Sequence, residues 1–379
     1  MADSEEMRPQ AFAATTDITK GELFPRERFW RDHQPWLKER GYRLRARYQP
    51  DWIASWKTDP QKIWFSCEDS LIGTFSHVLD ATRADGIPVA LKRIRPSDHP
   101  EEVGVGQLFS SEPLAHHQNN HCIPILDVLQ VPDDDDCLIL VMPFLYPWDY
   151  WPFETIGEVV DFFRQIFEGL NFMHQNHVSH RDCKSNNIMA DMLPLCKSPP
   201  HPCKQRRTLN LMSRVKQRSS RTQTPIKYYL VDFGLSRLYN PEDAPHLEIG
   251  GWGGDKTVPE FQAHDDSLCD PFAMDVYCIA NIVRQNFLEG RNHIRAKKGF
   301  DFMRELIADM TNDDPSARPK MDQVVSRYTD IVKGLSNWKL RSRVATVNEH
   351  PVLGVVRSVA HWSKQLRVMA SRTPSIPMA

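Results

Sequence analysis

One stretch of the chain, residues 180–187 with the sequence HRDCKSNN, constrains its fold more than any other. In this stretch Lys184 stands two residues after Asp182, and Asn187 stands five residues after it. An Asp-Phe-Gly sequence beginning at Asp232 follows downstream. Phosphoryl transfer requires an acid that accepts a hydroxyl proton and oxygen ligands that hold Mg²⁺ on the phosphates. Either motif alone occurs by chance, but their order and spacing together argue against a chance match.

These motifs resemble the catalytic loop and the metal-binding motif of eukaryotic protein kinases. The resemblance covers about residues 63–335. It implies an α+β, bilobal protein-kinase fold with a small β-rich N-lobe and a larger helical C-lobe, and ATP and Mg²⁺ as cofactors. It further implies that Asp182 is the catalytic base, that Lys184 neutralises the γ-phosphate, and that Asn187 and Asp232 bind the metal. The lysine at position 184 is a feature of Ser/Thr kinases. The long insert and the aromatic N-terminal extension are similar to those of the divergent kinase-like proteins expanded in mushroom-forming fungi.

The upstream residues match the ATP-binding positions of the family in part. Lys92 ends a Val-Ala-Leu run and matches the lysine that holds the α- and β-phosphates. In the turn over the phosphates, the first and third glycines are replaced by Leu71 and Ser76, and only Gly73 remains. Residues 141–145 resemble the hinge between the lobes. The nucleotide-binding positions that the resemblance implies are Gly73, Val78, Ala90, Lys92, Glu112, Met142 and Leu145.

The carboxylate that orients Lys92 has to be chosen among several glutamates. Glu101 and Glu102 follow Lys92 closely in the sequence, whereas Glu112 stands about twenty residues on. We therefore expect Glu112 to take this role, although Pro113 directly after it disfavours a helical conformation there.

Hydrophobic periodicity places the secondary structure around these motifs. Valine, phenylalanine and leucine recur at helical spacing over residues 155–176, which predicts an amphipathic core helix. Residues 72–78 and 89–92 are predicted strands with a hairpin turn at 83–86, and residues 188–191 and 227–231 are predicted strands on either side of an insert.

The insert, residues 192–226, stands where the kinase family has a tight turn. Residues 197–227 contain nine Lys and Arg and no Asp or Glu: Lys197, Lys204, Arg206, Arg207, Arg214, Lys216, Arg218, Arg221 and Lys227. Such a basic block is typical of a solvated, disordered loop. The alternatives are that residues 197–227 bind an import receptor or another anionic partner.

The segment after Asp-Phe-Gly corresponds to a kinase activation segment. Between Ser236 and Thr257 its only hydroxyl residue is Tyr239, and Gly253 stands about where kinases usually carry a threonine. Arg181 would ordinarily pair with a phosphate on this segment. The carboxylates available instead are those of Glu242, Asp243, Glu248 and Asp255, so we expect a carboxylate to hold the segment.

Two further positions match the lower lobe of the family. Asp275 resembles the residue that braces the backbone of the catalytic loop. Glu260 and Arg318 resemble the partners of a buried ion pair.

The predicted domain organisation has four parts. Residues 1–60 form an N-terminal extension whose first part is disordered, 61–143 the N-lobe, 144–335 the C-lobe with the insert, and 336–379 a C-terminal tail. The aromatic residues of the extension favour packing on the main domain over a peptide-docking surface. Residues 352–369 are amphipathic and basic, which favours packing on the lower lobe over contact with a membrane.

Composition restricts the remaining possibilities. The formal net charge of −2 gives no indication of a nucleic-acid partner, and the eight cysteines form no CxxC pair. No secretory signal and no apolar run long enough for a membrane span is present. We expect a cytoplasmic and/or nuclear protein with protein substrates. Three functions remain open: an active Ser/Thr protein kinase, a pseudokinase that acts as a nucleotide-binding or scaffold module, and a small-molecule phosphotransferase.

Overall fold

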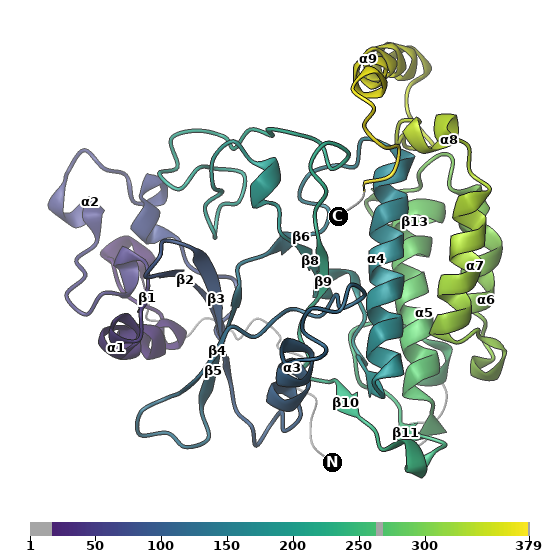
Figure 1. Ribbon diagram of the computed structural model, residues 1–379. Helices are drawn as coiled ribbons and strands as arrows, with labels where there is room; N and C mark the ends of the chain where they lie inside the picture. Colours follow the sequence, from purple (N-terminus) through teal and green to yellow (C-terminus); the bar gives the residue numbers. More distant parts are fainter. Residues whose placement is uncertain (1–16, 263–267, 378–379) are drawn as a thin grey trace. The chain divides into compact units, whose positions relative to one another are not determined.

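The five-stranded sheet comes from the first part of the chain and most of the long helices from the remainder, as the α+β expectation requires (Figure 1). The computed structural model describes residues 17–262 and 268–377. Most of the disorder expected near the N-terminus lies outside these residues, but Ile18–Lys20 is a short 3₁₀ helix.

The chain divides into two units. The first contains residues 1–93, 141–144 and 197–216, and the second contains the rest. The chain passes from the first unit to the second after Phe144, inside the segment that resembles the hinge. The division differs from the predicted segments because residues 94–140 belong to the second unit, whereas the extension and part of the insert belong to the first.

The five-stranded sheet is built around a hairpin of two antiparallel strands, β2 (Val78–Arg83) and β3 (Pro88–Ile94). The turn between them contains Gly86, whose positive φ of 86° favours glycine. The complete sheet has the order β1-β2-β3-β5-β4, with β4 at Asp127–Gln130 and β5 at Leu138–Pro143.

The strand predicted for residues 72–78 is wrong, since the structure begins its strand at Val78. The neighbour of β2 is instead β1 (Tyr42–Arg43), which comes from the N-terminal extension. The backbone of residues 71–77 bonds to side chains of the extension: Arg45 donates to the Leu71 carbonyl at 2.9 Å, and the Trp30 indole donates to the Ser76 carbonyl at 3.1 Å.

The extension packs on the sheet, as its aromatic residues predicted. Its helix α1 (Pro25–Glu39) buries Trp30 and Leu37. Arg47 and Glu27 form a buried ion pair at 2.6 Å that ties α1 to the following turn. A second short helix, α2 (Ser55–Thr58), completes the extension.

The second unit is organised around α4 (Ile156–Gln175), the helix predicted for residues 155–176. Thr155 caps it by accepting a hydrogen bond from the Glu158 amide at 3.1 Å. Its apolar side chains are fully buried, and it packs against α5, α7 and α8. The other helices of this unit are α3 (Glu102–Ser110), α5 (Pro271–Val283), α6 (Arg304–Met310), α7 (Met321–Lys333), α8 (Asn337–Arg341) and α9 (Pro351–Ala370).

Short paired strands connect the loops of the second unit to one another. The predicted strands on either side of the insert are confirmed as an antiparallel pair, β8 (Ile188–Ala190) and β9 (Tyr228–Leu230), with β6 (Tyr146–Pro147) beside β8. The remaining pairs are β7 (Val178–Ser179) with β10 (Arg237–Leu238), β11 (Glu248–Ile249) with β12 (Leu268–Cys269), and β13 (Gly290–Arg291) with β14 (Ile294–Arg295). Helices and strands therefore enclose the catalytic-loop segment between β7 and β8.

The insert is ordered, so the prediction of a disordered loop is wrong. Arg221 is buried and donates to the carbonyls of Trp148 and Trp151 at 2.9 and 2.7 Å. Thr222 donates through its amide and its hydroxyl to Glu158 at the start of α4. In the first unit, the buried His201 pairs with Glu68 at 3.0 Å. These contacts anchor the insert at two places.

Seven basic side chains of the insert are exposed: Lys197, Lys204, Arg206, Arg207, Arg214, Lys216 and Arg218. Binding of the insert to an import receptor or to an anionic partner therefore stays a prediction. In the described ranges, no helix combines the length and the hydropathy that crossing a bilayer requires.

Candidate active site

A single carboxylate from α5 fixes the backbone of the catalytic loop, residues 180–187. Asp275 is buried and accepts hydrogen bonds from the amides of His180 and Arg181 at 2.6 and 2.8 Å. His174 at the end of α4 contacts the same carboxylate at 3.1 Å. Arg181 has a positive φ of 65°, a conformation rare for a residue with a side chain. The bracing role expected of Asp275 is confirmed, and it holds the loop in this conformation.

The side chains of Asp182, Lys184 and Asn187 converge. The Asn187 amide nitrogen and the Lys184 ammonium each lie 2.7 Å from Oδ2 of Asp182. The backbone amide of Gly254 donates to the other oxygen, Oδ1, at 2.7 Å. Asp182 is buried, so these donors compensate for its lost hydration and fix the direction of its carboxylate.

Asp232 stands two residues after the end of β9, and the backbone next to it is bonded to the catalytic loop. The Val231 amide donates to the Asn187 carbonyl at 3.0 Å. Asp232 has a positive φ of 70°, and the next residue, Phe233, is buried with its ring 5.8 Å from that of His180. The second unit therefore brings together Asp182, Lys184, Asn187 and Asp232.

The donor set of this region fits Mg²⁺. The Asn187 amide nitrogen is occupied by Asp182, which leaves its oxygen as a ligand, and Asp232 contributes a carboxylate. Mg²⁺ prefers oxygen ligands and is usually held by one or two carboxylates together with substrate phosphates. Among residues 17–262 and 268–377 there is no cluster of three or more His, Cys, Asp or Glu suited to a metal ion.

Glu248 of β11 holds the activation segment to the catalytic loop. Its carboxylate pairs with Arg181 and Arg237, each at 2.8 Å, and accepts a hydrogen bond from the Tyr239 hydroxyl at 2.8 Å. The Arg181 guanidinium also lies 4.0 Å from the centre of the Trp252 ring. Burial, together with the neighbouring Glu248 carboxylate, raises the pKa of the Tyr239 phenol. The expected carboxylate partner of Arg181 is confirmed, and it is Glu248.

Two glycines of the segment, Gly253 and Gly254, lie against the catalytic loop. A Cβ added at Gly253 would lie 2.6 Å from the Arg181 carbonyl oxygen, and φ there is 83°. A Cβ added at Gly254 would lie 2.7 Å from the Lys184 side chain. No larger residue fits either position without a shift. The backbone amide that contacts Asp182 belongs to Gly254, the residue after the position where kinases usually carry a threonine. Sequence reasoning missed this contact.

The predicted ion pair of Glu260 and Arg318 is confirmed. Two parallel hydrogen bonds of 2.7 Å join the guanidinium to the carboxylate. Arg318 also donates to the Asn312 and Ala273 carbonyls at 2.8 and 3.1 Å. This arrangement ties the end of the activation segment to α5 and to the loop before α7.

The residues predicted to contact the nucleotide lie on elements of both units. Val78 is the cross-strand partner of Lys92, and Ala90 stands two residues before Lys92 on β3. These three side chains therefore project from the same face of the sheet. Gly73 precedes β2, and Met142 is on β5. Leu145 and Glu112 belong to the second unit.

The placement of Glu112 gives no support to the role expected for it. Helix α3 ends at Ser110, and Glu112 follows it with a side chain that is 67% exposed and lies 3.3 Å from His116. Glu102, which opens α3, is buried, and its Oε2 lies 3.3 Å from the position that a Cβ on Gly234 would take. Glu102 is therefore the carboxylate beside the Asp-Phe-Gly motif.

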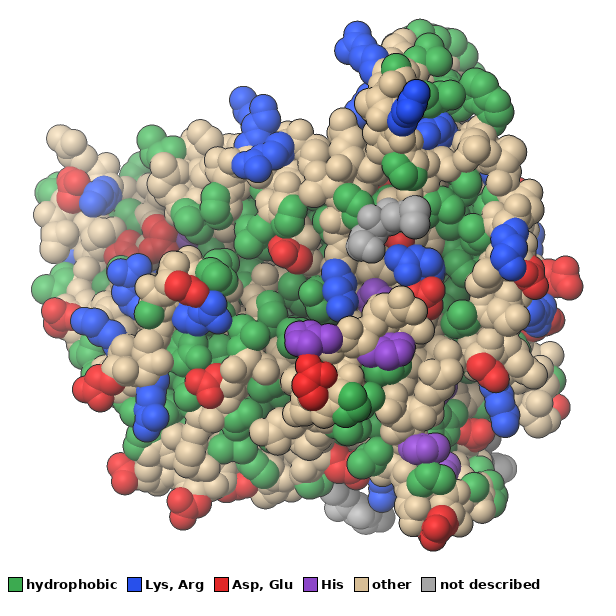
Figure 2. Space-filling model, viewed as in Figure 1, with side chains coloured by type: hydrophobic (Ala, Val, Ile, Leu, Met, Phe, Trp, Pro, Cys, Tyr) green, Lys and Arg blue, Asp and Glu red, His purple; other side chains and the backbone are tan. Residues whose placement is uncertain are grey.

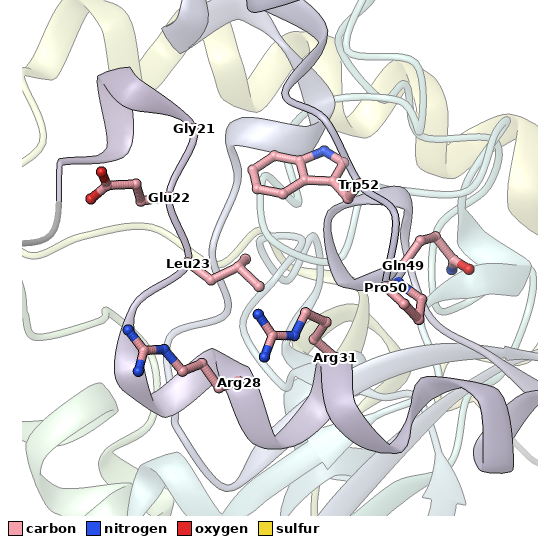
Figure 3. Close-up of a pocket in the computed structure, with 8 residues that line it drawn as sticks. All are labelled: Gly21, Glu22, Leu23, Arg28, Arg31, Gln49, Pro50 and Trp52. Atoms are coloured by element: carbon pink, nitrogen blue, oxygen red, sulfur yellow. The ribbon is translucent and has the colours of Figure 1, made fainter.

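A separate pocket of about 550 Å³ lies in the N-terminal extension (Figure 3). Arg28 and Arg31 from α1 line one side, and Gln49, Pro50 and Trp52 line the other. Glu22 also lines the pocket, and the Arg31 guanidinium pairs with Asp32 at 2.6 Å, so the pocket has charges of both signs. The peptide-docking surface considered for this region stays a prediction.

Comparison with known proteins agrees with this geometry. The family model described as "Protein kinase domain" matches residues 72–352. NUAK family SNF1-like kinase 2 from Homo sapiens is 28% identical over 126 residues, which are 31% of this chain and 20% of that protein. NUAK family SNF1-like kinase 1 from Mus musculus is 28% identical over 127 residues, which are 31% of this chain and 19% of that protein. The chain thus spans about a fifth of the length of these relatives. Because the family match covers most of the chain and includes the catalytic loop and the Asp-Phe-Gly motif, the chain belongs to the protein kinase domain family.

Proposed function

We propose that the protein transfers the γ-phosphoryl group of ATP to serine or threonine hydroxyls of protein substrates. The observation that carries this proposal is the convergence of Lys184 and Asn187 on the Asp182 carboxylate, in a loop whose backbone Asp275 fixes. Within the family, the insert and the extension support a relationship to the kinase-like proteins expanded in mushroom-forming fungi.

Each residue of the convergence has a separate task in this proposal. Asp182 accepts the proton of the substrate hydroxyl, and its direction is set by its three hydrogen-bond donors. Lys184 neutralises charge on the transferred group, which is the Ser/Thr-type feature. Asn187 and Asp232 supply oxygen ligands to Mg²⁺, which neutralises charge on the phosphates when bound.

On the nucleotide side, Lys92 would hold the α- and β-phosphates. We expect Glu102, in place of Glu112, to orient it. Glu102 is buried beside the backbone of Gly234, two residues after the proposed metal ligand Asp232. Glu102 thus belongs to the same unit as the proposed metal ligand, whereas the Glu112 side chain is exposed beyond the end of α3.

A pseudokinase is the alternative, and two observations favour it. Residues 71–77 form no strand and bond to the extension, so the turn over the phosphates differs from that of the family. The Gly254 amide also occupies an oxygen of Asp182. The chain retains the proposed general base and both proposed metal ligands, which supports the assignment as an active kinase.

The first test compares the wild-type protein with Asp182→Asn in Mg-ATP and a Ser/Thr peptide library. We expect the substitution to lower phosphate transfer by about 10²- to 10⁴-fold, because the general base is removed while the shape is kept. Asp313→Asn, which changes an exposed aspartate, serves as the control and should retain full activity. Wild-type transfer no greater than that of Asp182→Asn would contradict the assignment of the protein as an active kinase.

The second test compares Glu102→Gln with Glu112→Gln. We expect Glu102→Gln to raise the KM for ATP about tenfold, since a hydrogen bond to a charged group contributes about 1.5–3 kcal/mol. Glu112→Gln should leave this KM within about twofold, because an exposed ion pair contributes little. The reverse pattern would restore the assignment to Glu112.

The third test replaces Glu248 by glutamine. Loss of its charge leaves Arg181 without its ion-pair partner, and removing one member of a buried pair typically costs about 3–5 kcal/mol. We expect phosphate transfer to fall at least about tenfold, since the segment loses its attachment to the catalytic loop. Glu242→Gln, at an exposed position of the same segment, is the matched control. Equal activities of the two variants would contradict the role of Glu248.

A further inference from the structure

Helix α9 (Pro351–Ala370) presents an apolar face to solvent, although the sequence favoured packing on the lower lobe. Its exposed residues recur at helical spacing, with exposures between 59% and 65%: Val352, Val355, Val356, Val359 and Leu366. Residues at such spacing lie on one face of a helix. The predicted helix is confirmed, and it packs on the second unit through its opposite side, not through this apolar face.

The opposite side of α9 attaches it to the second unit. His361 and Gln365 are buried, and the His361 ring contacts the Arg341 carbonyl at 2.8 Å. Lys364 pairs with Glu154 at 2.5 Å, and Arg341 donates to the Thr373 carbonyl at 2.6 Å. These contacts attach the helix to the second unit, and the apolar face takes no part in them. In Figure 1, α9 lies beyond α8 at the edge of the helical unit.

The charged residues of α9 itself are all basic, but two of them pair with carboxylates outside the helix. Glu349, just before α9, pairs with Arg357 at 2.8 Å, and Glu154 pairs with Lys364, whereas Arg367 and Arg372 are exposed. From residue 351 to residue 379 the sequence contains no Asp or Glu, whereas it contains Arg357, Lys364, Arg367 and Arg372. Figure 2 shows hydrophobic side chains gathered over α9, with Lys and Arg side chains beside them. Two tryptophans, the exposed Trp338 and its neighbour Trp362, lie with their rings 5.1 Å apart at this helix. Tryptophan is enriched at membrane–water interfaces.

These features fit a lipid surface with negative charge better than other partners. A helix with an apolar face, basic flanks and no acid lies in the plane of a membrane interface, and anionic lipids attract its lysines and arginines. Two copies of this face would bring like charges together, which disfavours a dimer through α9. We propose that α9 binds the protein peripherally to anionic membranes, a property independent of its phosphotransfer.

The test measures co-sedimentation of the full chain with vesicles of phosphatidylcholine, alone or with about 30% phosphatidylserine. We expect binding to the anionic vesicles, at least about tenfold weaker binding to the neutral ones, and loss of binding at high salt because salt screens the charges. The double variant Val355→Glu/Val359→Glu should lose at least about tenfold in partitioning, since it places charge on the apolar face. Arg367→Gln/Arg372→Gln should weaken binding and reduce its salt dependence.

Two controls make the result specific to α9. Ile53→Glu changes an equally exposed apolar residue of the first unit and should bind as the wild type does. Thermal unfolding followed by circular dichroism should be unchanged in every variant, because the altered residues are exposed. Equal binding to neutral and anionic vesicles, or full binding by Val355→Glu/Val359→Glu, would overturn the proposal. A wild-type dimer that this double variant converts to a monomer, without vesicle binding, would identify the face as a self-association surface instead.

Discussion

The contact between Arg181 and Glu248 is the constraint on which the catalytic region of the second unit depends. Arg181 is held at its amide by Asp275 of α5 and at its guanidinium by Glu248 of the activation segment. A mostly buried guanidinium requires a negative partner, because an unpaired charge in the interior is strongly unfavourable. The pair therefore couples the conformation of the segment to that of the catalytic loop. Once the segment is attached, Gly254 reaches Asp182.

This arrangement leaves little room for regulation by phosphate on the segment. The Tyr239 hydroxyl already donates to Glu248 at 2.8 Å. A phosphate on Tyr239 would bring negative charge next to that carboxylate, and repulsion would weaken the attachment to Arg181. The Glu260–Arg318 pair fixes the other end of the segment by two hydrogen bonds. The activation segment is thus held by the permanent charges of ordinary side chains and needs no added phosphate.

Sequence reasoning succeeded where a short pattern decides the structure. The convergence of Asp182, Lys184 and Asn187 follows from their spacing in one loop, and α4 follows from its periodicity. Sequence reasoning failed where contacts between residues far apart in the chain determine the local structure. Nothing local shows that Trp30 and Arg45 would bond to residues 71–76, or that the extension would supply the strand beside β2.

The remaining errors have the same origin. Arg221 looks in sequence like its basic neighbours, but the carbonyls that it contacts lie some seventy residues earlier. Glu102 was discounted because of its position after Lys92, whereas its burial depends on the fold of α3 against the Asp-Phe-Gly segment. For α9 the periodicity predicted a helix but could not tell which face would contact the protein.

The central claim is that Glu248 performs the task of a loop phosphate. Its most direct test is phosphate transfer by bacterially produced protein after phosphatase treatment, with mass spectrometry to show that no phosphate remains. The account predicts that the unphosphorylated protein retains the activity of the untreated protein. Activity that appears only after Tyr239 is phosphorylated would contradict it.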